Sequence, residues 1–223
     1  GIVGEDGATH QGAFDLSYLS PIPNMVVAAP KDENELQHLL YTAVKAGRPM
    51  AVRYPRGYGE GLSPEPDLRL LPIGQAEVIQ EGRDLSFLAV GLAAGTALNA
   101  ARILYEDGID CSVINARFVK PLDSAVVLNQ AKKTGRLVTI EENTISGGFG
   151  SAVLALLAQN KLVDVRVECI GLPDRFIEHG DQDILRSKLG LDPAGIVARV
   201  KSSFPELMAG SPLTRHKGND CHR

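Results

Sequence analysis

The 223-residue sequence lacks the features that mark several classes of protein. Its three cysteines, Cys111, Cys169 and Cys221, lie far apart with no Cys-x-x-Cys pair, so neither a disulfide framework nor a zinc site is indicated and a reducing compartment is favoured. No apolar run approaches the roughly 18–20 residues that cross a bilayer, and no signal-peptide pattern is present. Lysine and arginine are scattered and the net charge is −4. We therefore expect a cytoplasmic protein that binds neither nucleic acid nor membrane.

The overall composition is typical of a globular protein. Apolar residues make up 44% and charged residues 22%, which supports a normal buried core in one large domain or two smaller ones. The chain has no initiator methionine and begins inside an apparent strand–loop unit. We therefore expect a fragment, or the ordered remainder of a longer protein.

Short apolar runs and helix-like segments alternate over residues 1–58, which is typical of part of an α/β layer. Asp32 followed by Glu35 resembles a capping box, and the helix that begins there ends at Gly47. We expect His38 on its exposed side. Its buried face is predicted to comprise Leu36, Leu39, Leu40, Ala43 and Val44. A further helix is predicted within 13–20, and strands are predicted at 25–29 and 49–54.

Residues 59–74 are rich in glycine and proline and predict a linker. Strands separated by helices over residues 75–206 predict a second domain, a mostly parallel sheet with both faces covered by helices. Residues 207–223 are polar and lack periodicity, so we expect a disordered tail. The second domain's predicted strands are 75–80, 85–91, 109–116, 136–141 and 163–170; its helices are 96–107, 152–159, 181–189 and 193–204, with one more after 123.

Chemically versatile side chains are concentrated in the segment from Gly4 to Gly12. Its closely spaced glycines suit a turn or a close approach of the backbone to a ligand. Asp6 can hold a substrate hydroxyl, and His10 can exchange a proton near neutral pH. Taken alone, this segment also fits a polar βα loop with a capping aspartate.

Several motifs together resemble the 1-deoxy-D-xylulose-5-phosphate synthase family, thiamine-diphosphate enzymes related to transketolase. In the first domain they are Asp6-Gly-Ala-Thr-His-Gln-Gly-Ala-Phe-Asp-Leu-Ser-Tyr, Ala29-Pro-Lys-Asp-Glu-Asn-Glu-Leu and Ala51-Val-Arg-Tyr-Pro-Arg-Gly. In the second domain they are Arg117-Phe-Val-Lys-Pro-Leu-Asp and Glu141-Glu-Asn-Thr-Ile-Ser-Gly-Gly-Phe-Gly-Ser. The resemblance covers residues 1 to about 205. It implies the latter part of a pyrimidine-binding domain, residues 1–58, and a transketolase-type C-terminal domain, residues 75–206.

The resemblance implies a decarboxylating condensation of pyruvate with D-glyceraldehyde 3-phosphate on thiamine diphosphate and Mg²⁺, in a homodimer. The product feeds isoprenoid, thiamine and pyridoxal synthesis. Asp6 and His10 match positions that hold the acceptor aldehyde and the reaction intermediate, and Arg56 matches the substrate-phosphate arginine. The family's Gly-Asp-Gly motif for the diphosphate and the metal is absent, since Glu5 precedes Asp6. The resemblance therefore assigns no cofactor-binding or metal-binding residue to this chain, which alone should be inactive.

Several other polar residues have structural interpretations. Arg53 is expected to be an ion-pair partner, and Tyr54 is expected to contribute packing. The acidic pair at 141–142 could suggest an anion-binding turn before a helix, but a structural role is favoured. Asp123 is a predicted N-cap. We expect His179 to be solvated, and Cys111 and Cys169 to be inert thiols within strands.

Two alternatives to the synthase remain open at this stage. The first is another member of the superfamily, a transketolase or a 2-oxo acid dehydrogenase beta subunit. The second is a non-catalytic assembly module that has kept only the fold. Asp6, His10 and Arg56 favour the synthase over both.

Overall fold

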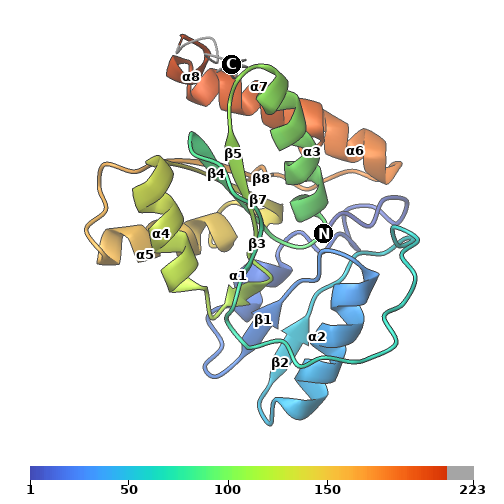
Figure 1. Cartoon of the computed structure of the whole chain (residues 1–223). Coiled ribbons are helices and arrows are strands. Elements are labelled where there is room, and N and C mark those ends of the chain that lie inside the picture. Colours follow the sequence, from blue (N-terminus) through green and yellow to red (C-terminus); the bar gives the residue numbers. More distant parts are fainter. Residues whose placement is uncertain (210–223) are drawn as a thin grey trace, which may run out of the picture.

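The eight strands found in residues 1–209, the part of the chain that the computed structural model describes, form two separate sheets (Figure 1). The smaller sheet has the order β2-β1-β6, and the larger has the order β3-β5-β4-β7-β8. The small sheet consists of β1 (Val26–Ala28), β2 (Met50–Val52) and β6 (Phe118–Lys120). The large sheet consists of β3 (Glu77–Gln80), β4 (Leu85–Ala89), β5 (Cys111–Asn115), β7 (Arg136–Thr144) and β8 (Arg166–Leu172).

Helices connect these strands and cover the sheets. They are α1 (Asp15–Leu19), α2 (Glu33–Lys45), α3 (Ala93–Glu106), α4 (Ser124–Thr134), α5 (Phe149–Gln159), α6 (Gln182–Lys188), α7 (Pro193–Ser203) and α8 (Glu206–Ala209). Four of them begin at an aspartate whose carboxylate accepts a backbone N–H of the first turn, as N-caps do. These aspartates are Asp32 for α2, Asp123 for α4, Asp181 for α6 and Asp192 for α7. The predicted N-cap role of Asp123 is therefore confirmed.

The large sheet confirms the predicted α/β fold with a mostly parallel sheet. Strands β5, β4, β7 and β8 run parallel, and β3 pairs antiparallel with β5 at the edge. Helices α3, α6 and α7 lie on one face, and α4 and α5 lie on the other (Figure 1). The first face buries an alanine-rich stripe of α3 against the sheet. That stripe comprises Ala94, Ala97, Ala100, Ala101 and Leu104.

The small sheet combines strands from both sequence domains, which the sequence did not predict. β1 and β2 come from the first domain and pair in parallel, while β6 comes from the second and pairs antiparallel with β1. Phe118 of β6 is fully buried among Val26 and Ala28 of β1 and Leu39 of α2. The two domains therefore share a hydrophobic core as well as a sheet.

Helix α2 buries a different face from the predicted one. Its buried residues are Glu35, His38, Leu39 and Thr42. Of the predicted apolar face, Leu40 is 46% exposed and Val44 is 81% exposed. His38, predicted to be exposed, is only 2% exposed, so that prediction is wrong. The cause is the segment 59–74, which lies along α2 and covers its polar face.

Polar side chains of α2 hold this segment in place. His38 accepts the backbone N–H of Arg69 on Nδ1 at 3.2 Å, and its Nε2 lies 3.1 Å from the Glu65 carboxylate. The hydroxyl of Thr42 accepts the N–H of Leu71 at 2.8 Å. The segment contains neither helix nor strand, and it runs around α2 before it enters β3 (Figure 1). It is therefore a bound strap rather than a free connection.

A partly buried cluster of charged and polar side chains also joins the two domains. Arg117 donates from Nε to Glu35 at 2.6 Å, and Lys31 contacts Glu77 at 2.6 Å. Asn115 donates to both carboxylates, at 2.9 and 3.2 Å. Glu35 is 4% exposed, so these partners take the place of water around its carboxylate. We call these five residues the interdomain cluster.

The end of the described chain differs in part from the prediction. Residues 207–209 were predicted to belong to a disordered tail, but they form the rest of helix α8. The remainder of the predicted tail, 210–223, lies outside the described residues. None of the helices in residues 1–209 combines the length and the apolar character needed to cross a membrane.

Candidate active site

The loop from Gly4 to Gly12 is closed by its own backbone hydrogen bonds. The N–H of Gly7 donates to the Gly4 carbonyl at 3.2 Å, and the N–H of His10 donates to the Gly7 carbonyl at 3.0 Å. Gly4 and Gly7 have φ angles of 83° and 71°, which a side chain would strain. The sequence uses glycine here because the backbone turns tightly and lies close to a neighbouring segment.

Asp6 and Arg56, two of the three predicted site residues, are brought together by the fold. Arg56 lies in the turn after β2, and its guanidinium forms an ion pair with the Asp6 carboxylate. The Arg56 side chain is 61% exposed and that of Asp6 is 31% exposed. An exposed pair of this kind contributes at most about 1 kcal/mol, so an incoming anion can displace Asp6 from the guanidinium.

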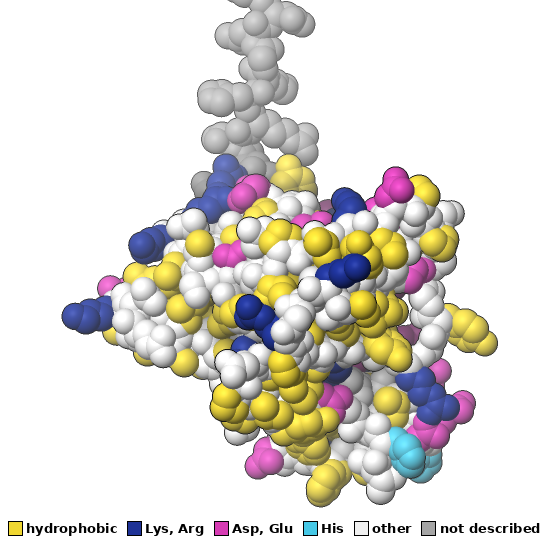
Figure 2. All heavy atoms as spheres, turned by 90° about the horizontal axis from the view of Figure 1, so that it is seen from below, with side chains coloured by type: hydrophobic (Ala, Val, Ile, Leu, Met, Phe, Trp, Pro, Cys, Tyr) yellow, Lys and Arg dark blue, Asp and Glu magenta, His cyan; other side chains and the backbone are white. Residues whose placement is uncertain are grey.

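His10 lies in the same loop but is not joined to that pair. Its side chain is exposed, and Nδ1 lies 3.0 Å from the hydroxyl of Thr9. Within residues 1–209, no hydrogen bond or ion pair connects His10 to Asp6 or Arg56. Figure 2 shows histidine side chains at the edge of the face seen from below, beside acidic and basic side chains. Because the His10 side chain is exposed, its imidazole is free to meet a ligand from solvent.

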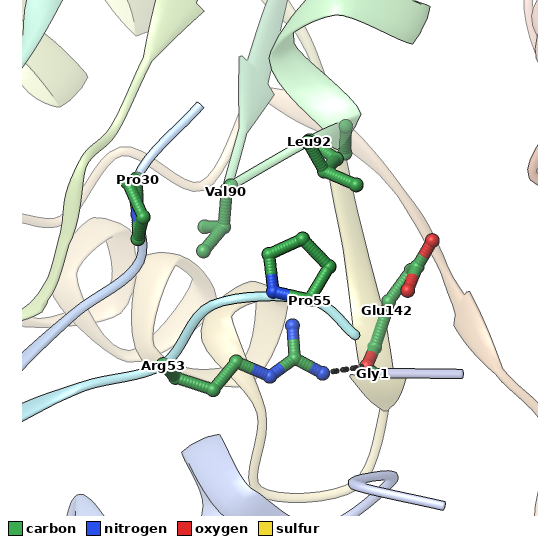
Figure 3. Close-up of a pocket in the computed structure, with 9 residues that line it drawn as sticks. Gly1, Pro30, Arg53, Pro55, Val90, Leu92 and Glu142 are labelled. Carbon is green, nitrogen blue, oxygen red and sulfur yellow. Dashed lines mark hydrogen bonds between the residues drawn. The ribbon is translucent and has the colours of Figure 1, made fainter. Parts of the chain in front are cut away.

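Arg53 lies between the two domains with its side chain 13% exposed, and it hydrogen-bonds to the end of the loop. Its Nη2 donates to the carbonyl of Gly12 at 3.1 Å. It also donates to the carbonyl of Glu142 at 2.5 Å (dashed in Figure 3). Its Nε lies 3.9 Å from the Asp15 carboxylate. Burial lowers the pKa of Arg53, and the nearby carboxylates of Glu142 and Asp15 oppose that effect. Its contacts fit the predicted structural role.

Glu142 of the second domain lies at the same contact between the two domains, which we call the junction. Its carboxylate accepts the N–H of Ile2 at 3.1 Å and pairs with Arg186 at 2.6 Å. Burial raises the pKa of Glu142, but Arg186 and Arg53 outweigh that effect and hold the pKa below its ordinary value. The carboxylate is therefore charged at neutral pH and ties the start of the chain to α6.

The junction occupies a position where open α/β sheets commonly bind ligands. In the large sheet, the strand that follows β4 in the sequence, β5, lies on one side of β4, and β7 lies on the other side. The strand order therefore reverses between β4 and β7, and their carboxyl ends flank a topological switch point. The crevice there is lined by residues 90–93 and Glu142, and Arg53 and Pro55 enter it from the first domain (Figure 3). Residues of the first domain therefore occupy the crevice in which an isolated sheet of this kind would bind a ligand.

A third segment, residues 178–182, borders the candidate site and was missed by the sequence reasoning. The side-chain amide of Gln182 donates to the carbonyls of Ile2 and Arg56, at 3.2 and 3.0 Å. His179 is exposed, as predicted, but it also packs against Gly7. A Cβ added to Gly7 would lie 3.2 Å from the Cβ of His179. No local pattern marks these residues, because their partners lie more than a hundred positions away.

Glu141 has the structural role that the sequence favoured. Its carboxylate accepts the N–H groups of Phe149 and Gly150, both at 2.8 Å, at the start of α5. Burial raises its pKa to about 7, against the lowering effect of those two N–H groups. The helix N-terminus that could have bound an anion is therefore filled by the protein's own carboxylate.

Three further predictions concern single side chains. Cys111 and Cys169 both lie in strands as free thiols, and burial raises the pKa of Cys111 to about 12. Burial also raises the pKa of Cys169, which is half-buried. Both thiols are therefore poorly reactive, as predicted. Tyr54, expected to contribute packing, is 59% exposed, and that prediction is wrong.

The described residues do not fit a diphosphate–metal site. In residues 1–209 no group of three or more His, Cys, Asp or Glu side chains is placed to hold a metal ion. The loop that contains Asp6 has Glu5 where the metal-binding motif has glycine, and Asp6 itself is engaged with Arg56. The arrangement can bind an anion at Arg56 and offer an imidazole nearby.

Two protein-family models match the chain. The model of the transketolase pyrimidine binding domain matches residues 1–60, and that of the transketolase C-terminal domain matches residues 74–196. Curated relatives called 1-deoxy-D-xylulose-5-phosphate synthase are also similar. The protein from Desulforudis audaxviator is 58% identical over 91% of this chain and 32% of its own length. Synthase 1 of Geobacter sulfurreducens is 52% identical over 95% of this chain and 33% of its own length.

The chain therefore spans about a third of the length of these relatives. Among solved structures, the inactive beta4 tetramer of a split-gene transketolase is 32% identical, with a TM-score of 0.77 over 89% of this chain and 63% of that one. A transketolase from Campylobacter jejuni shares the fold, with a TM-score of 0.66 at 22% identity over 90% of this chain and 29% of its own. The matched domains and the shared fold show that this chain belongs to the transketolase family.

Proposed function

We propose that this chain is the C-terminal portion of a 1-deoxy-D-xylulose-5-phosphate synthase. Such an enzyme joins pyruvate to D-glyceraldehyde 3-phosphate with loss of CO2, for the synthesis of isoprenoid, thiamine and pyridoxal precursors. The observation that carries the proposal is the pairing of Arg56 with Asp6 beside His10, in a chain 52–58% identical to relatives of that name. Since the chain covers only a third of those relatives, the activity belongs to the longer protein and the chain alone is inactive.

Arg56 is proposed to bind the phosphate of the acceptor aldehyde. Its guanidinium is exposed, and its planar fork matches two phosphate oxygens. A phosphate at that position replaces Asp6 as the partner of the guanidinium. Asp6 is then free to accept a hydrogen bond from a hydroxyl of the acceptor. Binding of the phosphate to Arg56 therefore also makes the Asp6 carboxylate available to the acceptor.

His10 is proposed to supply a proton to the alkoxide that forms when the new carbon–carbon bond is made. Its imidazole is exposed within the same loop as Asp6, and an imidazole can donate and recover a proton near neutral pH. Backbone hydrogen bonds fix the loop, so the side-chain torsions of His10 set the position of its ring.

Thiamine diphosphate and Mg²⁺ are part of the proposal for the longer protein. Since the described residues do not fit the diphosphate and its metal, we assign the binding of both to parts of the protein outside this chain and derive no step through them. The homodimer and the cytoplasmic location are likewise proposals. Large exposed side chains support a subunit contact, among them Phe14, which meets the exposed Phe176 edge to face at 6.3 Å.

A second candidate is a separate subunit of a two-chain enzyme of the same family. The split-gene transketolase supports it, because it matches 89% of this chain and was solved as an inactive beta4 tetramer. The candidate is weaker, because the relatives at 52–58% identity are about three times as long as the segment they share with this chain.

The test is an assay of the full-length protein that carries this sequence. With pyruvate, D-glyceraldehyde 3-phosphate, thiamine diphosphate and Mg²⁺, we expect release of CO2 and a five-carbon ketose phosphate in equal amounts. The 223-residue chain alone should be inactive. Activity with xylulose 5-phosphate and ribose 5-phosphate in place of pyruvate would show a transketolase instead. Absence of any turnover by the full-length protein would favour a non-catalytic assembly role and overturn the proposal.

A further inference from the structure

The segment Glu178–Gln182, here called the site clasp, contacts the candidate site at four places. The N–H of Gly180 donates to the carbonyl of Gly4 at 3.2 Å. The carbonyl of Glu178 accepts the side-chain amide of Gln11 at 3.1 Å. The remaining two contacts come from the side-chain amide of Gln182. The C-terminal domain thus holds both ends of the loop that carries Asp6 and His10.

Gln182 hydrogen-bonds to the backbone of both segments that carry the charged pair. Its Nε2 donates to the carbonyl of Ile2, at the entry to the loop, and to the carbonyl of Arg56, in the turn after β2. Both hydrogen atoms of the amide are therefore used, one on each segment. The backbone of Arg56 is fixed even though its side chain is largely exposed.

Close packing supports the same arrangement. A Cβ added at Gly4 would lie 3.0 Å from the Gly180 carbonyl oxygen and 3.0 Å from Cγ of Gln182, so the loop approaches the site clasp as closely as glycine permits. Gly4 is also in the left-handed region, which only glycine adopts without strain. The loop and the site clasp are therefore fitted to each other at the backbone level.

We propose that Gln182 is a positioning residue that sets the phosphate specificity of the acceptor site by holding the backbone of Arg56 in place. The inference rests on the proposed function, because it concerns the same arginine. Gln182 does not touch the acceptor in this scheme; it acts through Arg56. Its loss should therefore matter mainly for acceptors that carry a phosphate.

The first experiment uses the full-length protein with Gln182→Met, which keeps the length of the side chain and removes both donors. We expect kcat/KM for D-glyceraldehyde 3-phosphate to fall about tenfold, mainly through KM, because a small misplacement of a binding group has large effects. The value for D-glyceraldehyde, which lacks the phosphate, should stay within about twofold of the wild type. In an Arg56→Ala background, Gln182→Met should have no further effect.

The matched control is Gln37→Met. Gln37 also donates its amide to a backbone carbonyl, that of Glu65 at 3.2 Å, but it lies on α2, and its other hydrogen bond is to Asn34 of the same helix. This variant should retain wild-type kinetics with both acceptors. The proposal is overturned if Gln182→Met lowers activity equally with both aldehydes, or if its effect persists in the Arg56→Ala background. Gln182→Asn, which is too short to reach both carbonyls, repeats the test should Gln182→Met fail to fold.

The second experiment needs no activity and therefore separates this inference from the proposed function. Trypsin cleaves after Arg56, and the hydrogen bond from Gln182 to the Arg56 carbonyl restrains that peptide. In the 223-residue chain we expect Gln182→Met to be cleaved there several times faster than the wild type or Gln37→Met. Equal cleavage rates would overturn the positioning role, whatever reaction the longer protein catalyses.

Discussion

Arg56 is the side chain on which the proposed acceptor binding depends most. Replacing it with alanine in the full-length protein removes a charge-assisted pair of hydrogen bonds, so kcat/KM for D-glyceraldehyde 3-phosphate should fall roughly 10- to 100-fold. Arg56→Lys should recover part of that loss, because it restores the charge without the planar fork. Steady-state kinetics with each substrate varied in turn provides the measurement.

The control for this prediction is Arg83→Ala, which removes an exposed arginine that pairs loosely with Asp84 and Asp110, at 3.9 and 3.8 Å. It should leave the kinetics unchanged. An Arg56→Ala variant that raised KM for pyruvate and left KM for the aldehyde unchanged would contradict the assignment.

Glu142 makes a prediction about stability and pH. Because its pKa is lower in the folded than in the unfolded state, it stabilises the fold above its unfolded pKa, near 4.5, and that contribution is lost as pH falls through the folded pKa. Glu142→Gln should cost about 2 kcal/mol or more, since Arg186 and Arg53 lose a buried partner. Urea unfolding between pH 3 and pH 8 measures both effects, and the variant should show the flatter profile.

The comparison for Glu142→Gln is Asp183→Asn, which removes the other carboxylate that pairs with Arg186. That side chain is almost fully exposed, so its loss should change stability little. If both variants lost the same stability with the same pH profile, the buried pair would not be the cause.

His38 shows what sequence reasoning at the residue scale can miss. Apolar periodicity placed the buried face of its helix at Leu36, Leu39, Leu40, Ala43 and Val44. Of these, only Leu39 is buried, and the covered face is the one that hydrogen-bonds to the strap. A pattern of apolar residues cannot reveal a covering segment that pairs through backbone N–H groups. By contrast, the family resemblance singled out Asp6 and Arg56 separately, and the structure adds that the two side chains form an ion pair.

At the scale of single elements, two helical glycines should respond oppositely to the same substitution. Gly95 in α3 has open space where a Cβ would stand, whereas Gly150 in α5 would place one 2.7 Å from Oγ1 of Thr139 and 2.8 Å from Sγ of Cys169. Gly95→Ala should therefore stabilise the protein by about 0.5–1 kcal/mol. Gly150→Ala should destabilise it by about 1–3 kcal/mol.

Thermal unfolding of the two variants beside the wild type measures this difference. Each serves as the control for the other, because both add one methyl group to a helix whose backbone accepts alanine. A loss of stability in Gly95→Ala, or a gain in Gly150→Ala, would show that the close contact between α5 and the sheet does not govern the response.

Most elements of the fold could be predicted from the sequence, and the exceptions share a cause. The strands and helices around the large sheet carry long apolar patterns, and their boundaries were found within a few residues. Strand β6 has only three residues and exists because it pairs with β1, far away in the chain. Helix α8 is similarly short. Neither carries a local pattern that sets it apart, whereas β1 and β2, which are as short as β6, were predicted from apolar runs next to proline.

At the scale of the whole molecule, the interdomain cluster predicts that the two domains unfold together. Arg117→Ala leaves Glu35 buried with fewer partners, and loss of one member of a buried ion pair costs about 3–5 kcal/mol. Chemical unfolding followed by fluorescence and by circular dichroism should show one coincident transition for the wild type. The variant should unfold at lower denaturant concentration.

Lys133→Ala serves as the control for Arg117→Ala. Lys133 pairs with Glu81 on the surface, where an ion pair contributes at most about 1 kcal/mol. If Arg117→Ala cost no more than Lys133→Ala, the cluster would not hold the domains together. Two separate transitions in the wild type would contradict the shared core.

Because β6 belongs to the second domain, the small sheet is completed late in the synthesis of the chain. On the ribosome, β1 cannot meet its neighbour β6 until residues 118–120 have been made, roughly ninety residues after it. At about 5–20 residues per second, the first domain waits on the order of 5–20 s with one edge of its sheet unpaired. That interval is when the nascent chain is most exposed to wrong pairing, and when a chaperone that covers strand edges would protect it most.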